Sequence, residues 1–148
     1  MFSQTVEYAL RAIVYLADQG GNSRTIQQIA EVTRVPAGYL SKVMQGLSRN
    51  GLVRSQRGLH GGFVLARPAR QLTVLDVVQA VDPLRRIESC PLGLEGHLSL
   101  CPLHRRLDGA VALVEKALRE STIAELLAEP GKGKNIPRPL CSMSCEKG

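Results

Sequence analysis

Residues 35–66, VPAGYLSKVMQGLSRNGLVRSQRGLHGGFVLA, decide the fold of this chain. Pro36 suits a first helical position, which needs no backbone N–H donor, and an apolar face at helical spacing follows it: Leu40, Val43, Met44 and Leu47. The helix is predicted to end at Asn50-Gly51, because glycine readily adopts the left-handed conformation of a helix end. Short strands are expected at residues 52–55 and 63–66, with a glycine-rich turn at 58–62 between them. The stretch therefore predicts a helix followed by a β-hairpin.

The charge around this stretch has one sign. No acidic residue occurs between Glu31 and Asp76, whereas the same span holds Arg34, Lys42, Arg49, Arg54, Arg57, Arg67 and Arg70. A helix that enters the major groove and a hairpin that reaches a phosphate or the minor groove form a winged helix-turn-helix. An ordinary solvated basic face is the alternative, but it does not explain one sign of charge over both elements. Double-stranded DNA is therefore the predicted partner.

Composition narrows the class of protein further. The chain has 148 residues, 44% of them hydrophobic, and a formal charge of +6, which suits a polyanionic partner. No apolar run approaches the roughly 20 residues of a membrane span, and no signal peptide is visible, so we expect a cytoplasmic protein without membrane contact. No phosphate-binding glycine loop, no paired carboxylates on one helix and no Ser/His/Asp set occurs, so an enzyme is not expected.

Four segments are predicted, and they give a mainly α fold with a small β-hairpin wing. Residues 1–82 form the winged helix-turn-helix, in which Ser3, Thr25 and Thr73 have the positions of helix N-caps. The rest of the chain divides into a cysteine-containing loop at 83–101, a long dimerisation helix and a short last helix at 102–129, and a disordered tail rich in Pro, Gly and Lys at 130–148.

The long helix carries a row of apolar residues. Its members alternate in steps of four and three: Leu103, Leu107, Val111, Val114 and Leu118. Such a row can pack on the chain's own domain or on a second copy of the chain. We favour a homodimer, because proteins that read the major groove usually bind paired half-sites with matching two-fold symmetry.

Two thiols and two imidazoles lie within fifteen residues of the predicted loop: Cys90, His97, Cys101 and His104. In a reducing compartment, cysteines indicate metal ligands or redox-active thiols rather than a disulfide framework. Thiolates and imidazoles bind zinc and iron–sulfur clusters. Two buried thiols with surface histidines are the alternative, and structural zinc usually has closer cysteine pairs. Cys141 and Cys145 in the tail form a redox pair, an auxiliary ligand source or neither, and the sequence leaves this open.

Several short stretches resemble the Rrf family of winged-helix regulators. They are VEYALRA at 6–12, YL at 39–40, GLV at 51–53, RG at 57–58 with GGFVLA at 61–66, and LDVV at 75–78. The Arg-Gly…Gly-Gly-aromatic hairpin is the most specific, and the resemblance covers about residues 1–128. It implies a homodimeric transcription factor. Many such proteins hold a 2Fe–2S or 4Fe–4S cluster near the dimer interface, and their DNA affinity changes when the cluster is lost, oxidised or nitrosylated.

The resemblance also implies a set of cluster ligands. The family's loop usually has three cysteines, with a His after the last in its iron–sulfur regulators. Cys90 resembles the first, Cys101 the last and His104 the following His; Gly96 stands near the place of the middle cysteine. Some members take an acidic ligand from the partner's first helix, a position that Glu7 matches. The implied set is Cys90, Cys101 and His104 with Glu7 of the partner subunit, and a set containing His97 is the alternative. Fewer thiolates favour 2Fe–2S over 4Fe–4S.

The predicted DNA contacts are Tyr39, Ser41, Lys42, Arg49, Arg57 and His60. The first three lie near the start of the recognition helix, where base and phosphate contacts concentrate. By the resemblance, Ser41 and Lys42 read bases and Arg57 enters the minor groove. The resulting prediction is a dimeric regulator, expected to repress, that senses redox, iron or nitric oxide state through an iron–sulfur cluster. The alternatives are a cluster-free regulator that uses thiol oxidation or zinc, and a protein-interaction module.

Overall fold

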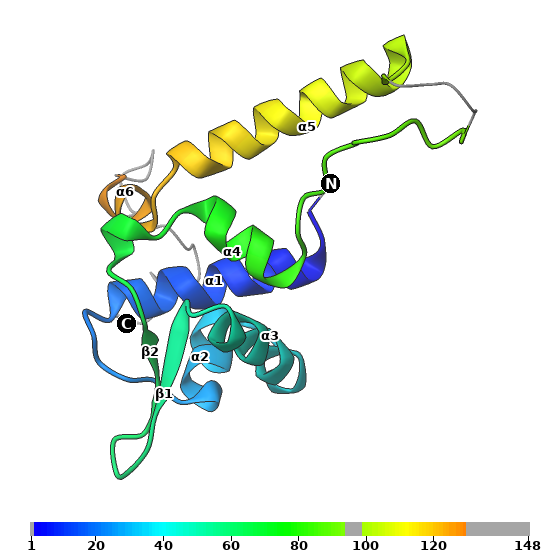
Figure 1. Ribbon diagram of the computed structural model, residues 1–148. Helices are drawn as coiled ribbons and strands as arrows, with labels where there is room; N and C mark the ends of the chain where they lie inside the picture. Colours follow the sequence, from blue (N-terminus) through cyan, green and yellow to red (C-terminus); the bar gives the residue numbers. More distant parts are fainter. Residues whose placement is uncertain (1, 94–98, 130–148) are drawn as a thin grey trace.

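The computed structural model describes residues 2–93 and 99–129, which contain helices and one two-stranded sheet (Figure 1). The elements in chain order are α1 (Gln4–Asp18), α2 (Ile26–Thr33), α3 (Ala37–Arg49), β1 (Val53–Gln56), β2 (Gly62–Leu65), the 3-10 helix η1 (Ala69–Gln71), α4 (Val74–Val81), α5 (Pro102–Glu120) and α6 (Ile123–Ala128). The mainly α fold with a hairpin wing is therefore confirmed. The tail at 130–148 and His97 lie outside the described residues, so the predicted disorder of the tail stays a prediction.

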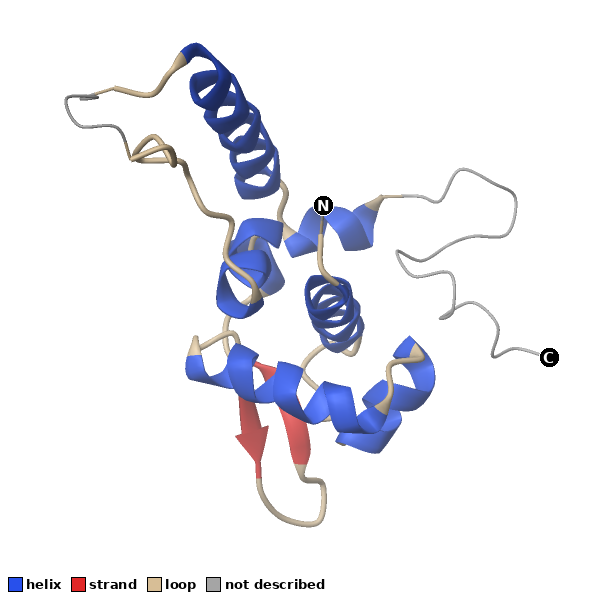
Figure 2. Ribbon diagram, turned by 90° about the vertical axis from the view of Figure 1, so that its right-hand side faces the viewer, coloured by secondary structure: helices blue, strands red, loops and turns tan. Residues whose placement is uncertain are grey.

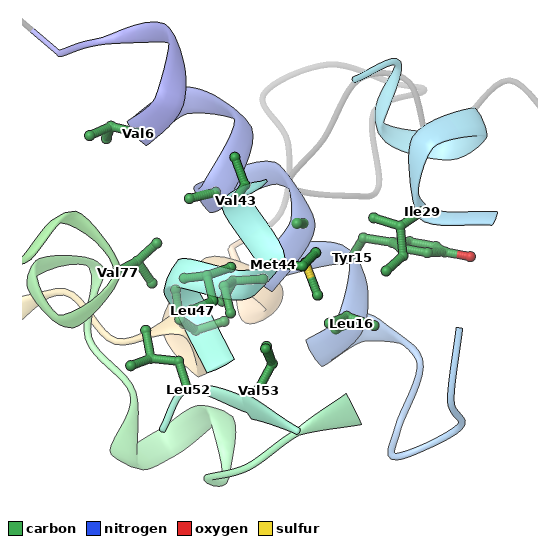
Figure 3. Close-up of a cluster of buried hydrophobic side chains, with 14 of the residues drawn as sticks. Val6, Tyr15, Leu16, Ile29, Val43, Met44, Leu47, Leu52, Val53 and Val77 are labelled. Carbon is green, nitrogen blue, oxygen red and sulfur yellow. The ribbon is translucent and has the colours of Figure 1, made fainter. Parts of the chain in front are cut away.

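The core forms around α1, which packs against α2, α3, α4 and α6. Seven residues of α1 are buried, and Ala9, Ala12 and Ile13 have no exposed surface, so neighbouring helices cover most of its circumference. Figure 3 shows Val43, Met44 and Leu47 of α3 in the same apolar cluster as Tyr15 and Leu16 of α1. This burial is the main stabilising contribution, and it fixes α3 with its opposite face outward.

Three helices begin with the same polar arrangement. The hydroxyls of Thr25, Thr73 and Thr122 each accept a hydrogen bond from the third helical residue, whose side chain accepts one from the threonine amide. These reciprocal bonds satisfy backbone N–H groups that a helix start would leave unpaired. The predicted caps of α2 and α4 are thus confirmed, as is the Ser3 cap of α1.

The predicted helix and hairpin are present, with small shifts in their bounds. Pro36 lies at the N-cap of α3 rather than in its first helical position, and each strand is displaced by one residue from its expected range. Gly51 has a φ of +71°, the left-handed conformation expected at the helix end. The strands pair antiparallel, with Val53 opposite Leu65 and Gln56 opposite Gly62.

The long helix α5 extends away from the core (Figures 1 and 2). None of its residues is fully buried, and α4 is the element that it contacts most. Of the predicted apolar row, Leu118 packs against the core, whereas Leu103 and Leu107 are 62% and 48% exposed. One end of the row therefore packs on the chain's own domain and the other end is uncovered, so the dimer stays a prediction. Among the described residues, no helix is both long and apolar enough to cross a membrane.

Candidate nucleic-acid interface and metal centre

One face of α3 points away from the core. Because Leu40, Val43, Met44 and Leu47 are buried on one side, the opposite side is left to polar residues. Lys42, Gln45 and Arg49 are exposed there at spacings of three and four residues, which places them in one row. The row contains two of the predicted DNA contacts. It also contains Gln45, which the sequence reasoning missed, although its position three residues after Lys42 was a usable signal.

Two further predicted contacts lie at the edges of this row. Ser41 is half-buried, and its hydroxyl donates to the Ala37 carbonyl oxygen at 3.2 Å. Tyr39 is 60% exposed and meets the ring of Tyr8 edge-on, with 6.1 Å between the centroids. The guanidinium of Arg11 lies 5.8 Å from the centroid of Tyr8. The start of α3 is thus supported from α1 by aromatic contacts.

A groove separates α3 from the hairpin. It measures about 730 Å³ and is lined by the starts of α2 and α3, including Thr25 and Gly38, and by residues of the turn, including Arg57. Arg57 and His60, the predicted contacts of the turn, are both exposed. Polar side chains of Gln27 and Gln56 also line the groove, and the sequence reasoning did not select them.

The hairpin is fixed to the rest of the molecule by one close backbone pairing. Arg24 and Phe63 exchange two backbone hydrogen bonds, of 3.0 and 2.8 Å, and Ser23 donates its hydroxyl to the His60 carbonyl oxygen. Gly62 makes the approach possible, because a Cβ atom there would lie 2.5 Å from the Arg24 carbonyl oxygen. The loop between α1 and α2 therefore holds β2 through an isolated backbone bridge, close to the turn that carries Arg57.

Cys90, Cys101 and His104 converge at the start of α5. Their possible ligand atoms all lie within 4.8 Å of one another, and all three residues are half-buried. His104 Nδ1 is 3.1 Å from Cys101 Sγ and 3.7 Å from Cys90 Sγ. Cys101 is the N-cap of α5 and His104 lies in its first turn, so the helix positions two of the three donors. Two thiols and one imidazole are a donor set that suits zinc or an iron–sulfur cluster.

The environment of Cys101 favours its thiolate. Hydrogen bonding from the backbone amide of His104 is the largest cause, and it holds the pKa of the Cys101 thiol below its ordinary value. Smaller contributions in the same direction come from the Leu103 amide and from the Cys90 side chain, against the opposing effect of burial. A thiolate at a helix start is a better nucleophile and a better metal ligand than a thiol.

An ion pair holds the segment before Cys90 against α5. Arg86 donates from Nε to Asp108 Oδ1 at 2.7 Å and from Nη2 to Asp108 Oδ2 at 2.6 Å. The Ile87 amide donates to Asp108 Oδ1 at 2.9 Å. These bonds, with Arg86 as the largest cause, lower the pKa of Asp108 to about 2. The sequence reasoning missed this pair, whose members lie far apart in the chain.

Glu7 does not lie in the cysteine–histidine group of its own chain. Its carboxylate is exposed and pairs with Arg11, Oε1 to Nε, at 3.0 Å. Arg11 also donates to the Thr33 carbonyl oxygen at 3.4 Å, at the end of α2. Glu7 is therefore not part of the group in its own chain, and its role as a ligand in a partner subunit stays a prediction.

Comparisons with known proteins assign the chain to a family. The family model Rrf2, described as "Iron-dependent Transcriptional regulator", matches residues 2–129. A relative in Aquifex aeolicus (strain VF5), with the provisional name HTH-type transcriptional regulator, is 31% identical over 131 residues, which are 86% of this chain and 91% of the relative.

Solved structures agree with this assignment. CymR, the global cysteine regulator of B. subtilis, matches with a TM-score of 0.72 and 26% identity over 86% of this chain and 96% of its own. IscR of T. potens matches with a TM-score of 0.73 and 24% identity over 90% of this chain and 91% of its own. The row on α3, the hairpin and these matches together show that the chain belongs to the Rrf2 family of winged-helix transcriptional regulators.

Proposed function

We propose that this chain is a cytoplasmic, homodimeric repressor that binds DNA through α3 and the hairpin and holds a 2Fe–2S cluster at Cys90, Cys101 and His104. The observation that carries the cluster proposal is the convergence of these three donors within 4.8 Å. The family's description as iron-dependent supports the same reading. When bound, such a cluster supplies a centre whose charge and ligation change with redox state and with nitric oxide.

The DNA-binding proposal rests on the exposed basic row of α3 and on Arg57 beside the groove. Its test is the affinity of wild-type protein and of Arg57→Ala for a duplex selected from a random pool, measured at several salt concentrations. If Arg57 contacts the phosphate backbone or the minor groove, the variant binds more weakly, and the slope of log affinity against log salt falls by about one unit.

Lys116→Ala is the matched control for this experiment. It removes one positive charge from an exposed side chain of α5, where Lys116 pairs with Glu120 at 3.8 Å. Its binding should stay close to that of wild type. If wild-type protein selects no duplex at all, the protein-interaction module becomes the better reading. If it does select a duplex, in vitro transcription from a template that carries this duplex tests repression.

The dimer proposal rests on the uncovered end of the apolar row. Leu103 and Leu107 are exposed, and a hollow of about 240 Å³ near the start of α1 is lined by Phe2, Val6 and Leu84 among others. Leu107→Glu should turn a dimer into a monomer in sedimentation experiments. Leu113→Glu is the control, because Leu113 is also exposed but lies on another face of α5. If both variants dissociate the dimer equally, a specific dimer contact along the apolar row is contradicted.

The fourth cluster ligand has to come from outside the three converging residues. Glu7 of the partner subunit and His97 are the two candidates. Protein purified without oxygen should be coloured, with equal iron and sulfide and a visible circular-dichroism signal. Glu7→Gln should then bleach or shift the spectrum if the partner supplies the ligand, whereas His97→Ala should do so in the alternative. Operator affinity that is unchanged by cluster loss would refute the sensing role.

A regulator without a cluster is the second candidate. Two observations favour it: the lowered pKa of the Cys101 thiol and the short distance between the Cys90 and Cys101 sulfurs. CymR, with 26% identity, is named a global cysteine regulator, which suits a signal linked to cysteine. Colourless protein from an anaerobic preparation would favour this candidate. Zinc analysis and the mass change on oxidation would then separate a zinc site from a thiol switch.

A further inference from the structure

The position of Cys90 needs an explanation, because the segment before it has no regular secondary structure. Residues 83–90, all within the described part of the chain, form neither helix nor strand. Cys101 and His104, by contrast, are positioned by α5. A segment without regular secondary structure loses conformational entropy when it brings one thiol to a fixed pair. Some contact must therefore hold this segment against α5.

Asp108 makes that contact with both of its carboxylate oxygens. Oδ2 accepts from Arg86 Nη2, and Oδ1 accepts from Arg86 Nε and from the Ile87 amide. The two Arg86 bonds, at 2.7 and 2.6 Å, form the parallel two-bond arrangement that is the strongest arginine–carboxylate geometry. The Asp108 side chain is only 16% exposed, so solvent screens this pair less than an ordinary surface pair.

The contact between Asp108 and residues 86–87 also lies close to the cysteine–histidine group. Asp108 follows His104 by four residues, so both side chains lie on the same face of α5. The residues that Asp108 binds precede Cys90 by only four and three positions. The bond to the Ile87 amide fixes the backbone itself, and thereby the point from which the chain continues to Cys90.

We propose that Asp108 is a positioning residue for the cysteine–histidine group, which acts by binding Arg86 and the Ile87 amide and so holds Cys90 beside Cys101 and His104 before any metal binds. The proposal deepens the ligand site described above and rests on it. Asp108 does not belong to the group of Cys90, Cys101 and His104, and its carboxylate accepts three hydrogen bonds from Arg86 and Ile87.

Glu115 provides a matched control within the same ion-pair network. It lies two turns further along α5 and faces the same Arg86, with 3.8 Å between Arg86 Nη1 and Glu115 Oε2. It also pairs with Arg119. No bond from the backbone of residues 86–87 to Glu115 is present in the described structure. Glu115→Gln therefore removes an equal charge from α5 without releasing the segment.

The first test measures the proximity of the two thiols without metal. Full-length protein with Cys141→Ser and Cys145→Ser is equilibrated with reduced and oxidised glutathione in the presence of a chelator. Two protein thiols and one oxidised glutathione give one Cys90–Cys101 disulfide and two reduced glutathiones, so the equilibrium constant reports the effective concentration of one thiol at the other. Asp108→Ala should lower this constant about tenfold, the lower end of the range for residues that orient ligands. Glu115→Gln should leave it close to the wild-type constant, because Glu115 makes no bond to the backbone of the segment.

The second test measures affinity for a metal. Cobalt(II) is titrated into the same variants, and the charge-transfer absorbance from thiolate to cobalt reports binding. Asp108→Ala should weaken binding about tenfold, and Asp108→Asn should lie between it and wild type, because the amide oxygen can still accept from Ile87. Far-UV circular dichroism of each variant checks that α5 is intact.

The two tests separate failure of the positioning role from failure of the site. If wild-type protein binds neither cobalt nor a cluster, the metal-holding function is wrong, and the disulfide equilibrium still decides the role of Asp108. If Asp108→Ala and wild type have equal disulfide constants and equal cobalt affinities, the positioning role is overturned. A loss of equal size in Glu115→Gln would also overturn it, because a general charge effect would then explain both variants.

Discussion

Replacement of Gly62 by alanine tests how the hairpin is held. Gly62 has a φ of +152°, within the range that residues with a side chain rarely adopt, and a Cβ atom there would lie 2.5 Å from the Arg24 carbonyl oxygen and 2.6 Å from its carbon. Both atoms belong to the backbone, so no side-chain rotation can relieve the overlap. The hairpin has to separate from Arg24, and the two hydrogen bonds between Arg24 and Phe63 are then lost.

The expected loss in the free energy of unfolding follows from these contacts. Two backbone hydrogen bonds contribute about 2 kcal/mol together. An alanine in an unfavourable backbone conformation costs about 1 kcal/mol more, since the freed strand can relax part of the strain. We therefore expect Gly62→Ala to lower the free energy of unfolding by about 3 kcal/mol. Because Arg57 lies in the turn between the strands, duplex affinity should fall as well.

Urea unfolding, hydrogen exchange and duplex binding measure this together. The amides of Arg24 and Phe63, which donate the two bonds, should exchange much faster in the variant. Gly109→Ala is the control: Gly109 lies within α5, and no atom lies within 4 Å of a Cβ placed there. That substitution should stabilise by about 0.5–1 kcal/mol. A Gly62→Ala protein with wild-type stability and unchanged protection at Phe63 would refute the pairing as the element that holds the hairpin.

Three further predictions concern single side chains. Thr73→Ala removes the hydroxyl that accepts from the Asp76 amide at 3.1 Å and should cost about 1 kcal/mol in urea unfolding, whereas a loss below about 0.3 kcal/mol would contradict the cap. Asp108 has its pKa lowered from 3.8 to about 2, so it stabilises the fold above its ordinary pKa and loses this effect as the pH falls toward 2. The stability difference between wild type and Asp108→Asn should therefore shrink over that range, and a constant difference would argue against the ion pair. In protein with Cys101 as its only cysteine, the rate of alkylation by iodoacetamide should rise with pH with a midpoint below that of free cysteine. The reason is that the His104 amide favours the Cys101 thiolate.

Local rules explain how much of the fold could be predicted from sequence. The caps at Thr25, Thr73 and Thr122 involve a residue and its third neighbour, so their signals are contained in four consecutive letters. The buried face of α3 follows from one helical period. The strand bounds differ from the expected ones by one residue: the Leu52 amide donates to the Leu47 carbonyl oxygen at the end of α3, so β1 begins at Val53, and Gly62 at the other end pairs with Gln56.

The ligands of the candidate metal site could be predicted from the sequence, but the residues that hold these ligands in position could not. Cysteine and histidine identities select Cys90, Cys101 and His104, and the helix start predicted at Pro102 places two of them on one turn. Nothing in the sequence links Asp108 with Arg86, because charged residues are common on exposed helices and twenty-two positions separate the two. Gln45 was missed for a different reason: it is uncharged, and it lies beyond the helix start where Tyr39 and Ser41 were expected to make contacts.

The candidate metal site and the DNA-binding hairpin lie far apart in the fold, which limits how metal binding could affect DNA binding. In both views the start of α5 and the hairpin lie at opposite ends of the molecule, with α1 and α4 between them (Figures 1 and 2). Within one chain the route runs from α5 to α4 and on to α3, where Asn50 Nδ2 donates to the Ala80 carbonyl oxygen at 3.2 Å. A second route runs through Glu7 of the partner subunit, if that carboxylate ligates the group.

The monomer expected from Leu107→Glu separates these routes. It retains every contact between α5, α4 and α3, but it loses the partner. We expect removal of the bound metal or cluster to change operator affinity in the dimer and to leave the affinity of the monomer for a half-site unchanged, because α4 is packed into the core against α1 and α3, and a closely packed core resists displacement. A monomer whose half-site affinity still responds to the metal would show that the signal passes through α4, and would remove the need for the partner's Glu7.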